Sequence, residues 1–245
     1  MSELVVKQIG KSFVDQEVLA DLSFSVKDGE FVSLLGPSGS GKSTLFHLIG
    51  GMYTPDTGDF YLDGNKITGK RGAISYTPQS PSLFPWRTIL ENVVLGAEIQ
   101  GKPDYQKARS MLAKAGLSGY EDTYPYALSG GMRQRVAFVR ALLSPQDFIC
   151  LDEPFSALDE FTRLEMQKWL LKIWEENRQS ILFVTHNIEE ALYLSDRIIV
   201  LSSKPATIKK EFNIPFERPR DPNLFLTEEF LQWKKSIYQE LQGAI

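Results

Sequence analysis

Residues 36–44 read Gly36-Pro37-Ser38-Gly39-Ser40-Gly41-Lys42-Ser43-Thr44. They fit the spacing G-x-x-x-x-G-K-[ST] of a phosphate-binding loop in the context that this loop requires, with an apolar strand-like run before it (31–35) and an apolar helix-like run after it (45–49). Glycines let backbone N–H groups approach phosphate oxygens, and the following helix adds the positive end of its dipole. We therefore expect all nine residues to bind a nucleotide.

Two side chains of this loop carry further chemistry. Lys42 is expected to reach the β- and γ-phosphates, as a catalytic as well as a binding residue, and the Ser43 hydroxyl is expected to ligate Mg²⁺. The competing interpretation is a glycine-rich strand–helix turn without a ligand, which the complete motif disfavours. His47, inside the helix, has no partner motif and is expected to be an ordinary packed or surface histidine.

Short apolar runs rich in β-branched residues recur at 31–35, 148–151 and 181–185. They are continuous rather than alternating and are separated by helix-like segments, which is typical of a mainly parallel sheet covered on both faces. Residues 22–26 alternate apolar and polar instead, and Asp28-Gly29 after them is a hairpin-turn signal. The sequence therefore predicts an α/β fold in which a small antiparallel sheet lies beside a mainly parallel one.

Between Trp86 and Pro145 the strand pattern disappears, and three helices are expected, at 88–95, 105–115 and 132–143. Two further helices are expected at 161–174 and 228–242. We expect one domain with three parts: an α/β core with an antiparallel part (1–86 and 146–213), a helical subdomain (87–145) and a C-terminal helical tail (214–245).

The composition excludes several classes of protein. The chain has 245 residues, 42% of them apolar and 24% charged, which is an ordinary globular mixture. A formal charge of −4 does not suggest a nucleic-acid partner. The single cysteine, Cys150, rules out an internal disulfide and is expected to be a buried core residue in a reducing compartment. The N-terminus has no signal-peptide pattern, and the apolar runs are far shorter than the roughly 18 residues of a spanning helix.

Polar side chains follow two of the predicted buried strands. Asp152 and Glu153 come after 148–151, and His186 follows 181–185. Strand ends of this kind converge on the ligand crevice of an open parallel sheet. Because neighbouring side chains on an extended chain point in different directions, Asp152 is expected to hold Mg²⁺, directly or through another ligand, while Glu153 accepts a proton from attacking water. His186 is expected to hold the γ-phosphate or that water.

A second anion-binding device is expected at Ser129-Gly130-Gly131, which opens the helix predicted at 132–143. Ser129 is a favourable N-cap, and the two glycines expose backbone N–H groups at a helix N-terminus. Such a triplet is by itself a weak signal, because most are simple caps or loops.

The segment Leu128-Ser129-Gly130-Gly131 resembles the signature of ATP-binding-cassette ATPases. Gln79 stands where that family has its Q-loop glutamine, Ser156-Ala157-Leu158-Asp159 resembles its D-loop, and His186 its switch histidine. The resemblance implies a P-loop NTPase of the RecA-like class that hydrolyses ATP with Mg²⁺, with Gln79 among both the catalytic and the metal-binding residues. It also implies a head-to-tail pair of cassettes, in which the signature residues complete the γ-phosphate site of the partner.

Three positions are less settled. Phe13 lies where the family often has an aromatic side chain that stacks on adenine, and a core phenylalanine is the alternative. Pro78 and Met132 depart from residue types common in the family at these positions. The first is expected to stiffen the loop, and the second leaves open what its side chain contacts.

The segment 83–87, Leu-Phe-Pro-Trp-Arg, is either buried locally or docks a partner. In the family this region meets a cytoplasmic helix of the membrane subunit. Together with 128–135, 157–163 and 217–221 it resembles the importer subgroup for nitrate, sulfonate, taurine and related solutes. The resemblance implies a peripheral protein at the cytoplasmic face of the membrane, with a permease partner, an indirect solute-binding protein and no nucleic acid.

Two other functions remain alternatives. One is a soluble cassette ATPase that serves an assembly without transport. The other is a P-loop kinase of small metabolites, which would leave the Leu128–Gly131 segment and Glu153 unexplained.

Overall fold

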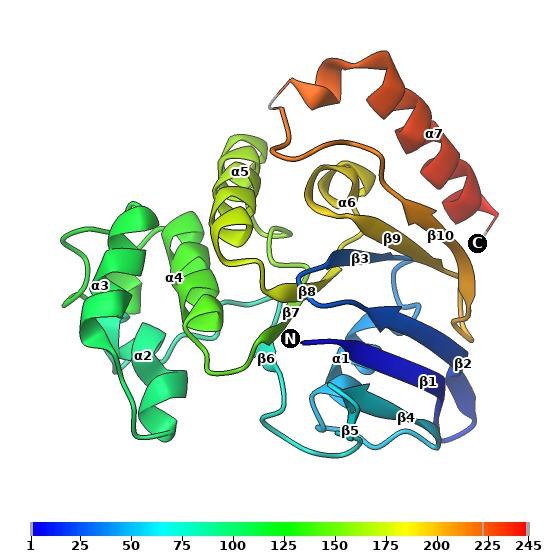
Figure 1. Ribbon diagram of the computed structural model, residues 1–245, viewed down its shortest axis with the longest axis horizontal. Helices are drawn as coiled ribbons and strands as arrows, with labels where there is room; N and C mark the ends of the chain where they lie inside the picture. Colours follow the sequence, from blue (N-terminus) through cyan, green and yellow to red (C-terminus); the bar gives the residue numbers. More distant parts are fainter. Residues whose placement is uncertain (1, 222, 244–245) are drawn as a thin grey trace.

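The computed structural model describes residues 2–221 and 223–243. Its larger sheet has the strand order β10-β9-β3-β8-β7-β6 (Figure 1). The bounds are β3 (Phe31–Leu35), β6 (Ser75–Thr77), β7 (Phe148–Asp152), β8 (Ser180–Val184), β9 (Arg197–Leu201) and β10 (Ile208–Asn213). All its neighbours pair in parallel except β10, which joins the edge antiparallel to β9. The α/β class and the mainly parallel sheet are confirmed.

The smaller sheet is antiparallel, as expected, with the order β2-β1-β4-β5. Its strands are β1 (Leu4–Phe13), β2 (Gln16–Val26), β4 (Thr57–Leu62) and β5 (Asn65–Lys66). The hairpin expected at Asp28-Gly29 is wrong. A turn does close there, with Glu30 N donating to Lys27 O, but the chain passes from β2 into β3 of the other sheet. The reason is that all five residues of β3 are buried, and such a strand needs cover on both faces.

Each helix expected from the sequence is present, with slightly different ends. The bounds are α1 (Lys42–Ile49), α2 (Ile89–Ile99), α3 (Tyr105–Lys114), α4 (Gly130–Leu142), α5 (Glu160–Asn177), α6 (Ile188–Leu194) and α7 (Glu228–Gln242), with 3-10 turns η1 (Pro125–Ala127) and η2 (Leu224–Leu226). Side-chain caps fix several starts: Thr88 forms a capping box with Glu91, and Ser129 and Asp159 cap α4 and α5.

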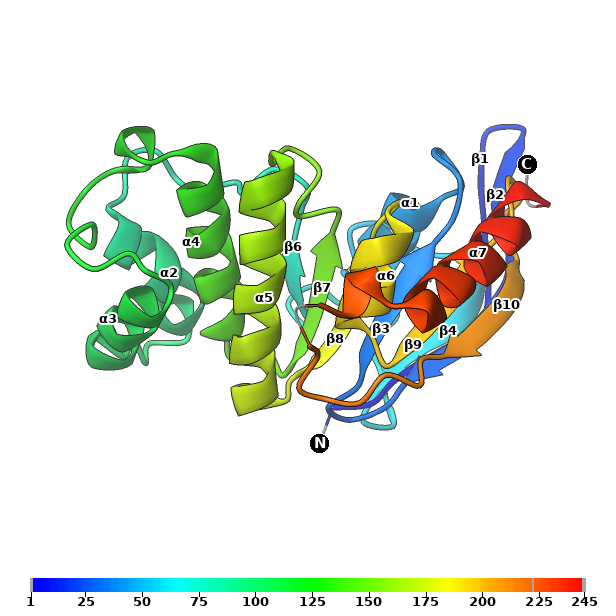
Figure 2. The same ribbon diagram turned by 90° about the horizontal axis from the view of Figure 1, so that it is seen from above.

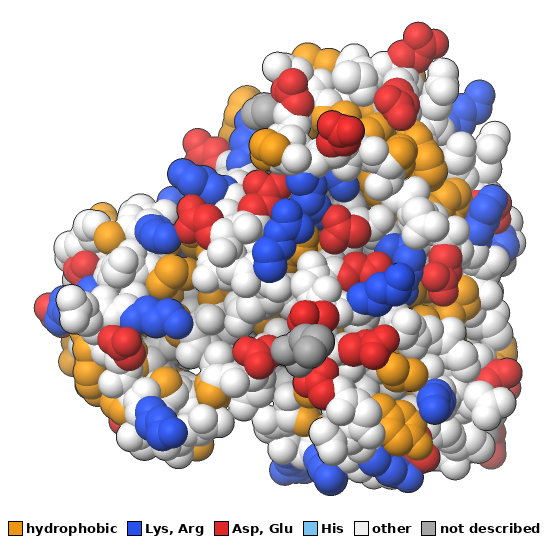
Figure 3. Space-filling view, in the orientation of Figure 1, with side chains coloured by type: hydrophobic (Ala, Val, Ile, Leu, Met, Phe, Trp, Pro, Cys, Tyr) orange, Lys and Arg blue, Asp and Glu red, His pale blue; other side chains and the backbone are white. Residues whose placement is uncertain are grey.

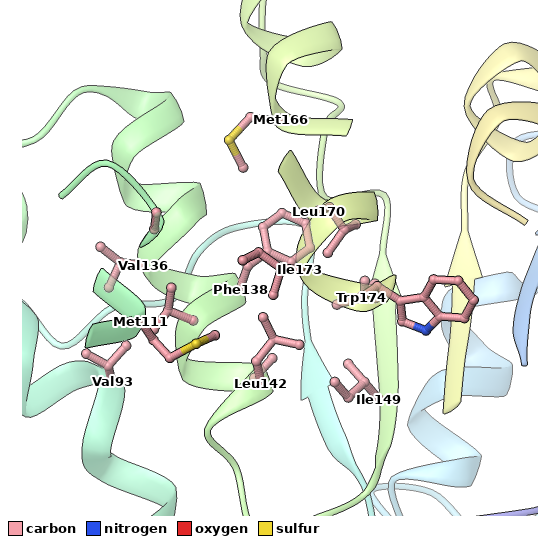
Figure 4. Close-up of a cluster of buried hydrophobic side chains, with 14 of the residues drawn as sticks. Val93, Met111, Val136, Phe138, Leu142, Ile149, Met166, Leu170, Ile173 and Trp174 are labelled. Carbon is pink, nitrogen blue, oxygen red and sulfur yellow. The ribbon is translucent and has the colours of Figure 1, made fainter. Parts of the chain in front are cut away.

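Successive residues of the parallel strands face opposite layers. Val32, Leu34 and Cys150 pack with α1 and the antiparallel sheet, and Cys150 is buried as expected. Ile149 and Phe183 face the opposite way, toward α5 and the helices α2–α4. Figure 4 shows that cluster, where side chains of α2, α3 and α4 meet those of α5 and β7. This core joins the helical layer to the sheet.

The views of Figures 1 and 2 place α2, α3 and α4 at one end of the molecule, beyond β6 and β7, and the antiparallel sheet at the other. The division into subdomains at residues 87–145 and 214–245 stays a prediction, and residues 1, 222, 244 and 245 of the predicted ranges lie outside the described residues. None of the helices in the described part of the chain is long and apolar enough to cross a bilayer.

The C-terminal segment packs across β9 and α6. Its helix α7 is tied down by two ion pairs, Lys210–Glu240 to β10 and Lys234–Glu189 to α6, at 2.7 and 2.6 Å. Phe225 of η2 stacks on Tyr193 of α6 with ring centroids 4.7 Å apart. Elsewhere, acidic and basic side chains are interspersed over the face drawn in Figure 3.

Substitution of Trp174 tests how the sheet packs against α5. This side chain is fully buried, meets Phe31 edge-on at 5.5 Å, and donates from Nε1 to Gln179 O at 2.7 Å. Trp174→Ala is expected to lower the free energy of unfolding by about 3–5 kcal/mol, because it leaves a large cavity. Urea titration followed by circular dichroism measures this change. Trp86→Ala, at a site that is 71% exposed, serves as the control and should change it by less than about 0.5 kcal/mol. Equal losses would contradict the packing described here.

Candidate nucleotide site

The 36–44 loop leaves the carboxyl end of the central strand β3 and enters α1. Its conformation depends on Gly41, which has a φ of 103° in the left-handed region. A Cβ atom there would lie 2.7 Å from Leu19 Cδ2 and 2.9 Å from Val18 Cγ1. Only glycine fits both this backbone conformation and the narrow space beside Val18 and Leu19, so the loop can pack closely against β2.

Lys42 is held by the loop itself. Its side chain is largely buried, and Nζ donates to Gly36 O at 2.9 Å and to Pro37 O at 2.8 Å. Burial lowers the pKa of this ammonium, while the nearby Glu153 and Asp152 carboxylates act to raise it. The charge is therefore fixed at the floor of the loop, where phosphate oxygens would meet it.

A cleft of about 370 Å³ opens over the loop. It brings together most of the residues that the sequence predicted for phosphate and metal binding. Its lining consists of Ser38, Gly39, Gly41, Lys42, Ser43, Thr44, Gln79, Asp152, Glu153 and Lys204. The other three residues of the loop, Gly36, Pro37 and Ser40, hold its shape instead. The carbonyls of Gly36 and Pro37 accept from Lys42 Nζ. The Ser40 N–H donates to Pro37 O at 3.1 Å.

Asp152 ends β7 on the side of the phosphate loop. Its carboxylate is hydrogen-bonded to the Ser43 hydroxyl and accepts from Tyr76 Oη at 3.3 Å. The carboxyl is 5% exposed, and burial raises its pKa despite these two donors. Oxygen ligands from carboxylate, hydroxyl and amide groups suit Mg²⁺, and Asp152, Ser43 and Gln79 all line one cleft. The residues present therefore fit the expected metal.

Glu153 lines the same cleft as Asp152 but has different side-chain partners. Its Oε2 lies 3.0 Å from Nδ1 of His186, and its backbone N–H donates to Val184 O at 2.9 Å. Its φ of 42° lies in the left-handed region, a conformation that costs a non-glycine residue on the order of 1–3 kcal/mol. The carboxylate lines the cleft, is partly exposed to solvent and contacts the imidazole.

Gln79 reaches the cleft from the loop after β6, and its Nε2 donates to Ser156 Oγ at 3.1 Å. This contact joins two segments that the resemblance assigned to separate motifs.

Asp159, at the end of the 156–159 segment, is the N-cap of α5. Its pKa is lowered by hydrogen bonds from Thr162, whose side-chain donor lies 2.6 Å away.

Ser129, Gly130 and Gly131 do not line the cleft. They form the start of α4, where Ser129 and Gly130 are exposed and Gly131 is half-buried, and Ser129 Oγ accepts from Met132 N at 3.3 Å. Met132 itself packs its side chain against the helical core, which answers where that side chain goes. This helix start therefore lies outside the cleft over the phosphate loop of its own chain.

Phe13 is 39% exposed, so the alternative of a core phenylalanine is wrong. Its ring meets Tyr53 edge-on at 5.5 Å, and Lys11 Nζ lies 5.4 Å from its centroid. Stacking on adenine stays a prediction. His47 is half-buried between Tyr53 and Tyr76, with ring centroids 5.4 and 6.0 Å away, so of the two expectations, packed or surface, it is the packed one.

Two residues of the site were not predicted from the sequence. Tyr76 holds Asp152 from the edge strand β6, and Lys204 lines the cleft from the β9–β10 loop. Both lie outside any motif, and only the sheet order brings them to the loop.

A family model described as "ABC transporter" matches residues 19–156. The aliphatic sulfonates import ATP-binding protein of Bacillus cereus is 39% identical over 241 residues, which cover 97% of this chain and 95% of that protein. The formylaminopyrimidine import ATP-binding protein of Halalkalibacterium halodurans is 42% identical over 231 residues, 93% and 90% of the two chains.

Among solved structures, a dimeric ATP-binding cassette in a post-hydrolysis state, bound to ADP and Pi, superposes with a TM-score of 0.74. It is 31% identical in sequence, and the match covers 86% of this chain and 98% of that one. The P-loop cassette fold is therefore shared over nearly the full length of the solved cassette.

Gly41→Ala tests the fit of the loop against β2. Because the added methyl group would collide with Val18 and Leu19, the variant is expected to bind a fluorescent ATP analogue at least about tenfold more weakly. Gly64→Ala is the matched control, with a similar positive φ of 74° and nothing within 4 Å of its Cβ. Fluorescence titration of both variants, with thermal unfolding as a check, makes the comparison. Binding by Gly41→Ala as tight as by Gly64→Ala would contradict the steric account.

Proposed function

The chain belongs to the ABC transporter family, and we propose on this premise that it is the ATP-binding and ATP-hydrolysing subunit that energises a membrane importer of a small solute. The observation that carries the chemistry is the Glu153–His186 contact of 3.0 Å beside the cleft that contains Lys42. The two import proteins named above support uptake as the direction. The resemblance of 83–87 and 217–221 favours a solute of the nitrate, sulfonate or taurine kind.

Residues in and beside the cleft divide into groups with different tasks in hydrolysis. Lys42 and the backbone of the 36–44 loop hold the phosphates of ATP, and Glu153 takes the proton of the water that attacks the γ-phosphorus. His186 orients that carboxylate and the γ-phosphate. Asp152, Ser43 and Gln79 would hold Mg²⁺, which when bound neutralises charge on the phosphate oxygens.

The position of the start of α4 supports a two-chain working unit. Ser129, Gly130 and Gly131 offer a capped helix N-terminus that lies outside the cleft of their own chain. We infer that they bind the γ-phosphate held by a second copy, head to tail, so that two nucleotides lie between two chains. Hydrolysis removes the bridging phosphate and lets the pair open.

A rigid loop supports docking to a membrane subunit. The buried Asn92 accepts from Phe84 N at 2.8 Å and donates to the carbonyls of Phe84, Arg87 and Thr88 at 2.9–3.1 Å. Arg140 holds the preceding turn through the carbonyls of Pro81 and Ser82. One amide side chain thus contacts four backbone atoms and fixes the backbone, so that the loop can present a side chain without first being ordered.

Trp86 is the side chain presented. It is 71% exposed, with Phe84 beside it at a ring distance of 5.2 Å. Leu83 packs on the helical core, so local burial accounts for one end of 83–87 and not for Trp86. We infer that Trp86 anchors a cytoplasmic helix of a permease, with a solute-binding protein acting on that permease. The chain would then lie at the cytoplasmic face of the membrane.

Glu153→Gln tests the base and the dimer together. The amide cannot take a proton, so ATP turnover is expected to fall by about 10²–10⁴-fold while ATP binding remains. The variant should then accumulate as a dimer with Mg·ATP, seen by light scattering coupled to gel filtration. Glu228→Gln, at an exposed residue of α7, is the control and should behave as the unaltered chain. Normal turnover by Glu153→Gln would contradict the role of Glu153 as the base. A variant that stays monomeric with Mg·ATP would contradict the site shared between two chains.

Trp86→Ala tests docking. Because Trp86 lies outside the cleft, ATPase activity should stay within about twofold, while co-purification with a membrane subunit after gentle detergent extraction should fall at least about tenfold. The control for lost apolar surface is Tyr238→Ala, since Tyr238 is also an exposed aromatic residue but lies on α7, away from this loop. Undiminished co-purification of Trp86→Ala would contradict docking at this loop. Recovery of the unaltered chain only from cytosol would favour the soluble assembly factor.

A further inference from the structure

A buried polar network lies behind the segment that carries His186. Thr185 Oγ1 donates to Glu190 Oε2 at 2.6 Å, and Asn187 N donates to the same threonine oxygen at 3.0 Å. Asn187 Oδ1 in turn accepts from the backbone N–H of Glu190 at 3.3 Å as the cap of α6. Thr185 is thus bonded directly to the Glu190 carboxyl group, and Asn187 is linked to it through the Thr185 hydroxyl and to the Glu190 backbone N–H.

The other side of that carboxyl group faces α5. Arg163 Nε lies 3.6 Å from Glu190 Oε1, and Gln167 is hydrogen-bonded to the same carboxylate. Arg163 Nη2 also donates to Leu158 O at 2.9 Å. Since Leu158 lies two residues after Ser156, the partner of Gln79, Glu190 connects the loop after β7 with the loop after β8.

Burial of the Glu190 carboxyl group disfavours its charged form. Glu190 is 5% exposed, and burial raises the pKa of its carboxyl group although Thr185 and Arg163 favour the charged form. Its neighbour Glu189 is half exposed and forms an ordinary surface ion pair with Lys234. A buried ionic group of this kind adds little stability over an apolar one, and its best-attested use is to fix one arrangement of the groups it contacts.

We propose that Glu190 is a positioning residue for the ATPase reaction. It holds Thr185 directly, and Asn187 through the Thr185 hydroxyl, so that His186 stays against Glu153 and moves together with residues 155–159 of the loop after β7. The proposal rests on the proposed function. The hydrogen bonds to Thr185 set the place of the imidazole, and Arg163 transmits any shift of the Leu158 carbonyl to the same carboxylate. Glu190 itself does not line the cleft.

Steady-state kinetics of Glu190→Ala, Glu190→Gln and Glu189→Gln test this role. Glu190→Ala is expected to lower kcat by about tenfold to a hundredfold, because the imidazole loses its support, with KM for ATP changed by less than about twofold. Glu190→Gln keeps an oxygen acceptor for Thr185 and should recover part of the loss. Glu189→Gln, one residue away on the same helix, should keep the original kcat.

Thr185 gives a second pair of variants if Glu190→Ala does not fold. Thr185→Val removes the hydroxyl that joins Glu190 to Asn187 at nearly constant volume, and should lower kcat as Glu190→Ala does. Thr185→Ser keeps the hydroxyl and should restore it.

The proposal is overturned if Glu190→Ala and Thr185→Val keep kcat within about twofold, if they lose ATP binding to the same extent as kcat, or if Glu189→Gln loses as much. A different result contradicts the proposed function: the unaltered chain has no ATPase activity, or its activity survives Lys42→Ala.

Discussion

Parallel pairing of the fully buried strands β3, β7 and β8 brings three loops to one edge of the sheet. Lys42 follows the first strand, Asp152 and Glu153 end the second, and His186 follows the third. No side chain of this set is near another in sequence except the two acids, so their meeting depends entirely on strand order. Apolar burial on both faces holds that order, because no strand can slip without exposing its core side chains.

The cleft formed at that edge contains opposite charges that are partly withdrawn from water. Burial shifts the pKa of Lys42 downward and that of Asp152 upward, and each group is held by its own hydrogen bonds rather than by a direct ion pair with the other. Phosphate oxygens can therefore meet the ammonium without first breaking a salt bridge. Fixed dipoles and charges of this kind stabilise charge that develops during phosphoryl transfer.

The sequence alone predicted much of the site. The phosphate loop was recognisable because its chemistry is local: glycines, a lysine and a hydroxyl at fixed spacing between a strand and a helix. Caps such as Ser129 were equally readable, since a cap needs only its own next three residues. The turn at Asp28-Gly29 was read wrongly because the partner of β3 is chosen by burial, over a distance that no dipeptide encodes.

What the sequence determined by itself was therefore the set of local devices: the loop, the helix starts and the acids at strand ends. Tertiary structure decided which of them share one cleft. It placed Gln79 on Ser156, Lys204 in the lining of the cleft and Glu190 against Thr185, and it left the start of α4 outside the cleft of its own chain. The reason is physical: contacts between segments follow from how apolar faces pack, whereas caps and turns follow from hydrogen bonds within a few residues.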